Sequence, residues 1–371
     1  MKIVVAVDSF KGSLKSFEVG RAAEIGIKKA APDAEVKVYP LSDGGEGFCK
    51  ILTDGLGGKI QMVKVAGALG NRISVVFSEV GKTAIIEVAA AAGLAQVPKN
   101  LRNPMRTTSF GVGEMILQGM KDGCNEFIIG LGGSATNDCG LGMLTALGFN
   151  FGAGIFGRNL AHVRKIETEK VPPEIFDCKF KIACDVKNPL TGENGCTAVY
   201  SPQKGTDEKT VEQMEGWIKN FADLTFQTFN IENKSVEGDG AAGGLGFAFR
   251  TFLKGELLHG ADLVLDTLKI SDGLKDADIL ITGEGNIDEQ TLQGKAPASV
   301  AKIAKSVNPK IKVIAIGGGV KNIAADSLFD ATFSILREPV TVEMAMQPII
   351  ATKNISATVE QIIRLLVKSE K

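Results

Sequence analysis

The chain has 371 residues, of which 44% are hydrophobic and 23% charged, and its formal net charge is −1. This length predicts two domains, and the composition is that of a soluble globular protein. A nearly neutral chain offers no electrostatic reason to bind nucleic acid or a membrane surface, so neither is expected as a partner.

Two residue types limit the chemistry. Histidine occurs only at His162 and His259, and neither lies in a supporting catalytic motif, so catalysis is expected to use carboxylates, lysine, arginine, hydroxyls, backbone dipoles or a metal ion. The six cysteines form no CxxC pair and no zinc spacing, which predicts reduced thiols. The N-terminus lacks a signal-peptide pattern and no run approaches the ~18 apolar residues of a membrane span, so a cytoplasmic location is predicted.

The first third begins with alternating strand and helix patterns. Ile3–Val7 is a β-branched run typical of a buried parallel strand, a helical pattern starts at Ser16, and Glu35–Leu41 predicts a second strand. The pattern then changes, because Lys59–Val65 and Arg72–Glu79 alternate apolar and polar residues as antiparallel strands do.

The middle third contains a strand, a glycine-rich turn and a helix in succession. Ser109–Met120 predicts an amphipathic helix, and the apolar run Phe127–Ile129 predicts a strand. The glycine-rich stretch Gly130–Gly142 follows, and Met143–Leu147 continues as an apolar helical run. A second glycine-rich turn is predicted at Gly238–Gly246.

The last third returns to α/β alternation. Its predicted elements are the strand Asp278–Thr282, the helix Ala296–Val307, the strands Lys312–Ile316 and Ala331–Leu336, and the helix Thr358–Val367. Because the two ends share a pattern that the middle lacks, the predicted class is α/β. The predicted architecture is a doubly wound parallel-sheet domain of Rossmann or flavodoxin type, made from residues 1–60 and 265–371. A second α/β domain, residues 61–264, is inserted, with a cleft between the two.

Glycine-acid clusters follow the predicted strands. In open α/β sheets ligands bind beyond the carboxyl ends of the strands, so these clusters are candidate site segments. They are DSFKGS (8–13), SDGGEG (42–47), GLGGSATND (130–138), DVKNPL (185–190) and GEGNID (283–288). Five such clusters, from both predicted domains, suggest a site lined with carboxylates and backbone amides.

The Gly130–Asp138 turn is the strongest candidate for a phosphate site. A glycine-rich turn between strand and helix presents backbone N–H groups at a helix N-terminus, where an anion is favoured. A tight turn with a helix cap and no ligand is the alternative. The turn also matches a dinucleotide fingerprint loosely, but the acid expected about 20 residues further on is missing, so a nicotinamide cofactor is disfavoured.

Several side chains outside this turn suit phosphate or metal chemistry. Ser9 and Lys11 are placed to meet phosphate oxygens, and the cluster at 42–47 suits magnesium. Glu284 and Asp288, four residues apart, could share a metal, whereas Asp185 suits a general base, a metal ligand or an Asx-turn. Lys295 follows a glycine, but Ala296 stands where a Walker A motif needs Ser or Thr.

Seven collinear blocks resemble the bacterial glycerate kinase type 1 family over essentially the whole chain. They are VAVDSFKGSL (5–14), LSDGGEGF (41–48), GLGGSATND (130–138), DVKNPLTGENG (185–195), SPQKGT (201–206), GDGAAGGLG (238–246) and GEGNIDEQTLQGKAP (283–297). The resemblance implies a two-domain α/β kinase that phosphorylates glycerate with ATP and magnesium. The chain departs from the family pattern at Cys139, at Asn286 and at Asn71.

The resemblance and the residue chemistry together predict a set of roles. The turn would bind the ATP phosphates, with Ser9, Lys11 and Lys295 nearby. Mg²⁺ would lie among Asp43, Glu284 and Asp288. Arg72 would hold the glycerate carboxylate, and Asp185 would accept the proton of the glycerate hydroxyl. The predicted phosphate contacts in the turn are Gly130, Gly132, Gly133, Ser134, Thr136 and Asn137.

Three further points concern substrate and partners. ATP and D-glycerate are the expected small-molecule partners, and the resemblance favours the 2-hydroxyl over the 3-hydroxyl as the acceptor. A homodimer is left open. The rival hypotheses are an NAD-dependent hydroxy-acid oxidoreductase and a non-catalytic nucleotide or metabolite sensor.

Overall fold

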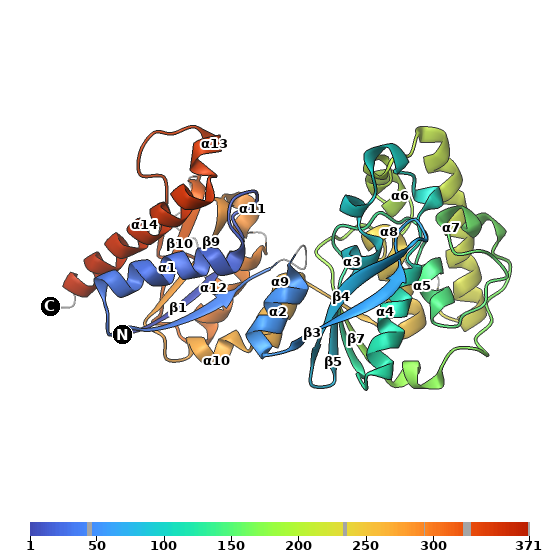
Figure 1. Cartoon of the computed structure of the whole chain (residues 1–371), viewed down its shortest axis with the longest axis horizontal. Helices are drawn as coiled ribbons and strands as arrows, with labels where there is room; N and C mark the ends of the chain where they lie inside the picture. Colours follow the sequence, from blue (N-terminus) through green and yellow to red (C-terminus); the bar gives the residue numbers. More distant parts are fainter. Residues whose placement is uncertain (43–46, 233–235, 293, 322–327, 370–371) are drawn as a thin grey trace. The chain divides into compact units, whose positions relative to one another are not determined.

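The computed structural model describes residues 1–42, 47–232, 236–292, 294–321 and 328–369 (Figure 1). The chain divides into two compact units. Residues 1–43 and 261–371 form the terminal unit, and residues 44–260 form the inserted unit. Compactness does not test whether each part folds alone, so the domain boundaries expected near 60 and 265 stay a proposal.

The terminal unit alternates strands and helices along the chain. Its elements are β1 (Lys2–Val7), α1 (Ser16–Ala30), β2 (Glu35–Pro40), α9 (Gly260–Thr267), α10 (Ile270–Leu274), β9 (Ile279–Ile287), α11 (Glu289–Leu292), α12 (Ala296–Val307), β10 (Lys312–Val320), β11 (Ala331–Ser334), α13 (Val342–Ala345) and α14 (Pro348–Ser369).

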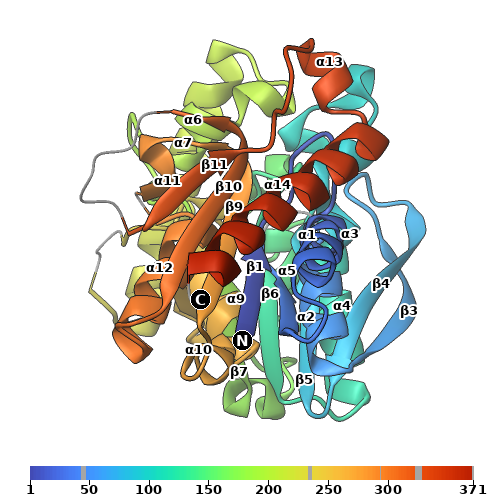
Figure 2. The same cartoon turned by 90° about the vertical axis from the view of Figure 1, so that its left-hand side faces the viewer.

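These strands form the doubly wound parallel sheet that the sequence predicts. The strand order is β11-β10-β9-β1-β2, and every pair is parallel. Ile3, Val5 and Val7 of β1 pack in one cluster with α1 and α14, which contact each other over the sheet (Figure 2). Since side chains alternate across a strand, the opposite face is left for α12, which contacts β9, β1 and β10. The order reverses between β1 and β9, and ligands bind at such a switch point in this class of fold.

The inserted unit begins with a short helix and two long strands. Its elements are α2 (Phe48–Leu56), β3 (Lys59–Ala66), β4 (Arg72–Val80), β5 (Thr83–Glu87), α3 (Val88–Ala92), η1 (Leu94–Gln96), η2 (Lys99–Leu101), η3 (Pro104–Arg106), α4 (Phe110–Lys121), β6 (Glu126–Gly130), α5 (Leu141–Ala146), η4 (Gly157–His162), η5 (Pro173–Asp177), β7 (Lys179–Ala183), α6 (Cys196–Tyr200), η6 (Pro202–Lys204), α7 (Glu208–Phe229), α8 (Ala241–Leu253) and β8 (Glu256–Leu258).

The sheet of the inserted unit is mixed. Its order is β3-β4-β5-β6-β7-β8, in which β3, β4 and β5 pair antiparallel and β5 to β8 pair parallel. Phe127 and Ile129 of β6 and Phe180 and Ile182 of β7 face a core that α4, α5, α7 and α8 also fill. Phe127 stacks on Phe180 with their ring centroids 5.0 Å apart. The antiparallel hairpin predicted for 59–79 is confirmed.

One local prediction needs correction. The sequence places Glu284 in a loop after a strand that ends at Thr282, but β9 continues to Ile287, because it stays paired with β10 as far as Val320. The glycine-rich stretch at 238–246 forms the predicted turn before a helix, and Ala242, Gly243 and Gly244 adopt left-handed backbone angles at the start of α8. No helix in the described ranges combines the length and apolar content needed to cross a membrane.

Candidate active site

Three parallel strands of the inserted unit end at one edge of its sheet. Glu87 of β5 pairs with Gly130 of β6, and Gly130 pairs with Ala183 of β7. The segments that follow these strands therefore emerge side by side. They include the glycine-rich turn after β6 and Asp185 after β7.

The glycine-rich turn exposes two of its glycines and buries its other residues. Gly132 and Gly133 are exposed, whereas the side chains of Thr136 and Asn137 are fully buried. Gly133 needs its left-handed φ of 75°, which glycine adopts without steric cost. Within the described part of the chain, Thr136 Oγ1 and Asn137 Oδ1 have no hydrogen-bond partner. Buried polar atoms in native proteins are nearly always paired, so these two atoms are candidates to bind a water or a ligand.

A buried lysine lies behind the turn. Lys204 at the end of η6 is only 3% exposed, and its Nζ donates to the carbonyl oxygen of Thr136 at 2.6 Å and to Ser134 Oγ at 3.2 Å. Burial lowers the pKa of Lys204 to about 8, although Cys196 and Asp138 oppose that shift. The turn thus has a cationic group fixed beneath it, which favours anion binding.

A buried carboxylate joins the turn to its two helices. Asp138 Oδ2 accepts hydrogen bonds from Ser109 N at 2.8 Å and Ser109 Oγ at 2.7 Å, and the amides of Gly140 and Gly142 donate to the same carboxylate. Burial raises the pKa of Asp138, and the hydrogen bonds from Ser109, Gly142 and Gly140 oppose that rise. Asp138 therefore caps α5 and ties it to α4, which fixes the end of the turn.

Asp185 lies beside a histidine. Its Oδ1 accepts a hydrogen bond from Gly260 N at 2.7 Å and lies 3.3 Å from His259 Nε2. Both side chains keep some contact with solvent, with 29% exposure for Asp185 and 38% for His259. This carboxylate is held by a backbone donor while remaining accessible, as a proton acceptor must be. No local pattern points to the histidine, because it lies far along the chain from Asp185.

The terminal unit has its own candidate residues at the switch point. Asp8 N donates to Gly283 O at 2.8 Å, and the Asp8 carboxylate accepts from Ser9 N at 2.6 Å. Ser9 and Lys11 follow β1 at this edge, and Glu284 lies on the neighbouring β9. Strands β1 and β9 thus bring these residues, predicted to bind phosphate and metal, to one edge of the sheet.

Glu284 and Asp288 are linked through a threonine. Thr291 Oγ1 donates to Glu284 at 2.7 Å and accepts from Asp288 N at 3.0 Å, and Lys295 Nζ lies 3.4 Å from Glu284. In the described ranges no three His, Cys, Asp or Glu side chains cluster as a metal site. The donor chemistry still fits Mg²⁺, because this ion takes oxygen ligands and often uses one or two carboxylates completed by substrate phosphates and water.

Two predicted residues stand apart from this arrangement. Arg72 donates to Glu114 at 2.6 Å and to the carbonyl oxygen of Lys64, so its guanidinium already has partners within the inserted unit. These contacts do not test the predicted contact of Arg72 with the substrate carboxylate, which stays a prediction. Asp43 lies outside the described residues.

The fold defines a two-unit α/β protein with parallel strands, a glycine-rich turn after β6 and carboxylates near the carboxyl ends of its strands. A model of the glycerate kinase family matches residues 3–367. The chain therefore belongs to the glycerate kinase family and is an enzyme that phosphorylates glycerate.

Individual relatives agree over nearly the whole length. The chain is 42% identical to a glycerate kinase of Haemophilus influenzae, over 91% of this chain and 92% of that protein. It is 38% identical to the glycerate 2-kinase of Escherichia coli K12, over 96% and 98% of the two chains. A crystal structure from Salmonella typhimurium LT2, of a protein assigned to the glycerate kinases, matches with a TM-score of 0.90 and 39% identity, covering 100% of this chain and 99% of that one.

Proposed function

We propose that the protein transfers the terminal phosphoryl group of ATP to the 2-hydroxyl of D-glycerate, with Mg²⁺ as cofactor and ADP as the second product. The observation that carries the proposal is the turn at 130–138, which combines exposed glycines, unpaired buried polar atoms and the Lys204 ammonium beneath it. Phosphoryl transfer depends mainly on positioning and charge neutralisation, which is what such a turn offers. The similarity to a protein named glycerate 2-kinase supports the choice of the 2-hydroxyl.

The chain's own residues have distinct roles in this proposal. The amides of the turn bind phosphate oxygens, and Lys204 keeps the carbonyl of Thr136 and the hydroxyl of Ser134 in place behind them. Asp185 accepts the proton of the glycerate hydroxyl, while Gly260 N–H orients the carboxylate. Glu284 and Asp288 would hold Mg²⁺, which neutralises phosphate charge when it is bound. Lys11, Ser9 and Lys295 are proposed as phosphate contacts of the terminal unit. The contact of Arg72 with the glycerate carboxylate and the role of Asp43 as a metal ligand stay predictions. A cytoplasmic location and a homodimer also stay predictions.

The substitution Asp185→Asn tests the role of the base. We expect kcat to fall about 10²–10⁴-fold, the contribution typical of a positioned general base, while the affinity for ATP is unchanged. Steady-state kinetics and nucleotide titration by calorimetry measure the two quantities. Asp177→Asn is the matched control, because Asp177 is exposed at the end of η5 in the same unit and should leave kcat unchanged. A near-normal kcat for Asp185→Asn would refute the assignment.

The identity of the phosphorylated hydroxyl has a direct readout. Proton-coupled ³¹P NMR of the product from ATP, Mg²⁺ and D-glycerate distinguishes the two positions. A phosphate on C2 couples to one proton and gives a doublet, whereas a phosphate on C3 couples to two and gives a triplet. A triplet would exclude the 2-position.

A further inference from the structure

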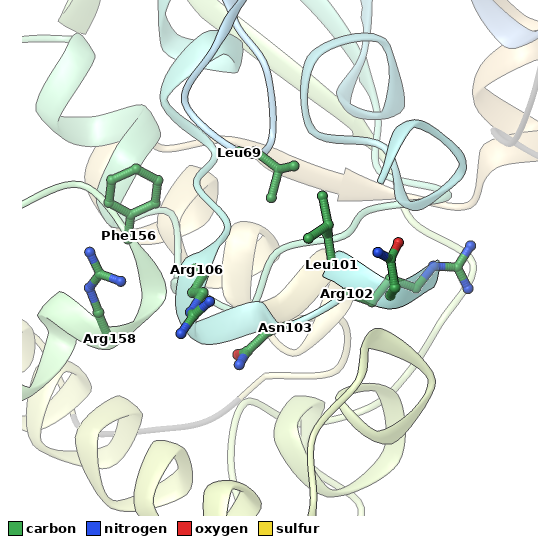
Figure 3. A pocket seen from close by; sticks show the side chains of 8 residues that line it. Leu69, Leu101, Arg102, Asn103, Arg106, Phe156 and Arg158 are labelled. Carbon is green, nitrogen blue, oxygen red and sulfur yellow. The ribbon is translucent and has the colours of Figure 1, made fainter. Parts of the chain in front are cut away.

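A pocket of about 520 Å³ opens in the inserted unit, and Figure 3 shows the side chains that line it. Its lining includes Arg102, Arg106, Arg158, Asn103, Phe156 and Leu69, and no acidic residue. Ligand pockets for metabolite-sized molecules have volumes of about 300–1,000 Å³, so the space exceeds the need of a single inorganic ion. None of the lining residues belongs to the turn at 130–138 or to the surroundings of Asp185.

Two of the three arginines have neither an acidic partner nor a side-chain hydrogen bond within the described residues. Within the described residues, neither Arg106 nor Arg158 forms an ion pair, and both side chains are exposed. Other arginines of the chain do form such pairs, namely Arg21 with Glu24, Arg72 with Glu114, Arg250 with Asp239 and Arg364 with Glu360. Arg102 differs as well, because its guanidinium donates to the carbonyl oxygens of Val97 and Leu94 at 3.4 and 3.5 Å. In Figure 3 it extends away from the other two.

The backbone holds the two unpaired arginines in fixed positions. Arg106 ends η3, whose first turn is capped by Asn103 Oδ1 accepting from Met105 N at 2.9 Å. Arg158 lies in η4, and Gly157 before it donates to Thr107 O at 3.0 Å, directly after Arg106. A Cβ at Gly157 would lie 2.3 Å from Pro104 O, so the two segments are in close contact. The backbone positions of the two arginines are therefore fixed relative to each other, which places both side chains at one pocket.

The chemistry of the lining selects a class of ligand. The guanidinium groups of Arg106 and Arg158 offer planar sets of donors that match phosphate oxygens. The lining carries three positive charges and no acidic residue, so a phosphate monoester, with a charge of roughly −2 at neutral pH, offsets more of this charge than a single carboxylate does. Phe156, which lies under Arg158 at 5.4 Å, and Leu69 add an apolar wall for an organic body. We propose that this pocket is a separate binding site for a small organic phosphate.

The pocket is also connected to the turn through its own backbone. Thr107 follows Arg106, and its Oγ1 donates to Ala135 O at 3.0 Å. Ser109, two residues further on, donates to Asp138. A ligand that binds Arg106 and Arg158 therefore contacts the segment that supports the catalytic turn.

The test compares a double substitution with a matched control. The double variant Arg106→Gln/Arg158→Gln removes both guanidinium charges from the pocket. The control variant Arg164→Gln removes a charge elsewhere in the same unit, because Arg164 lies outside the pocket and donates to the carbonyl oxygens of Ala161 and Val163. Calorimetric titrations use two probes, 3-phosphoglycerate and AMP, which distinguish a three-carbon acid phosphate from a nucleotide source. At least one probe should lose about tenfold or more in affinity with the double variant and keep its affinity with Arg164→Gln. Kinase kcat and the KM values for ATP and glycerate should stay at wild-type levels in both.

Two results would overturn the proposal. Equal affinities of all three proteins for both probes would show that the pocket binds no organic phosphate of these kinds. A parallel rise in KM for ATP or glycerate would show that the arginines belong to the kinase site itself. Circular dichroism checks folding, and the single variants Arg106→Gln and Arg158→Gln replace the double variant if it unfolds. The titrations are run with the kinase site saturated by ADP and D-glycerate, so the binding readout reports the pocket and not the proposed kinase site.

Discussion

At the scale of single residues, Lys204 is the least expected feature of the site. A fully buried lysine is rare unless it is paired, because desolvation penalises its charge. Here the ammonium has two oxygen acceptors from the turn, and burial lowers its pKa to about 8 from an ordinary 10.5. The stability of the fold should therefore depend on pH through this group.

The substitution Lys204→Met tests that dependence. Between pH about 8 and 10.5 the folded lysine is neutral while the unfolded one keeps its proton, so this group makes the free energy of unfolding rise with pH. Between pH about 7 and 9.5 the wild type should gain about 2 kcal/mol relative to Lys204→Met. Urea unfolding at the two pH values measures the difference.

The other titrating groups near Lys204 contribute little to the difference in pH dependence between the wild type and Lys204→Met. Cys196 and Asp138 face Lys204, and burial raises the pKa of Cys196 to about 11. A buried thiol acts with the opposite sign over this range, but it is present in both proteins and largely cancels in the difference. Lys121→Met, at the exposed end of α4, is the control and should show no such change. Equal pH responses of the wild type and Lys204→Met would contradict the prediction.

At the scale of elements, α8 shapes the turn by close packing. Gly243 O accepts a hydrogen bond from Cys139 N at 2.9 Å, and a Cβ on Gly243 would lie 2.1 Å from Thr136 O. Cys139 itself has a left-handed φ of 50°, a conformation that glycine adopts more readily than other residues. The start of α8 and the turn therefore fit together only with minimal side chains at their contact.

Gly243→Ala should destabilise the fold and weaken nucleotide binding together. A left-handed alanine and an overpacked contact cost about 2–4 kcal/mol in combination, and relief of the clash moves the turn. Gly216→Ala is the matched control, since Gly216 lies exposed in α7 with nothing near its Cβ position. That change should stabilise the helix by about 0.5–1 kcal/mol. Unfolding curves and nucleotide titrations of both variants provide the measurement, and unaltered binding by Gly243→Ala would exclude this role of α8.

At the scale of the whole molecule, one unit comes from a single stretch of the chain, whereas the other is built from two. All strands of the mixed sheet and its largest core cluster come from residues 44–260. The parallel sheet of the terminal unit instead depends on both ends of the chain, because β1 pairs with β9 at its centre.

A fragment of residues 44–260 should consequently fold alone. We expect a cooperative thermal transition by circular dichroism and retained protection in hydrogen exchange. A fragment of residues 261–371 should lack a cooperative transition, because it loses β1 and leaves the edge of β9 unpaired. Absence of a transition in the 44–260 fragment would show that the units depend on each other for stability.

Local patterns determined much of this protein. The β-branched run at 3–7 and the alternation at 59–79 predict the α/β class and the antiparallel hairpin, and the seven blocks predict the family. These predictions hold because strand period, turn chemistry and motif spacing are properties of neighbouring residues. The extension of β9 to Ile287 escapes such reasoning, since pairing with β10 outweighs the glycines in that stretch.

Only the tertiary structure decided which side chains surround the site. Lys204 reaches the turn across 68 residues of sequence, and His259 comes to Asp185 through the pairing of β7 with β8. The sequence likewise does not predict that Arg72 pairs with Glu114. Nor does it predict that Arg106 and Arg158 lack an ion pair within the described chain. Contacts of this kind depend on which elements pack together, and no local periodicity encodes that choice.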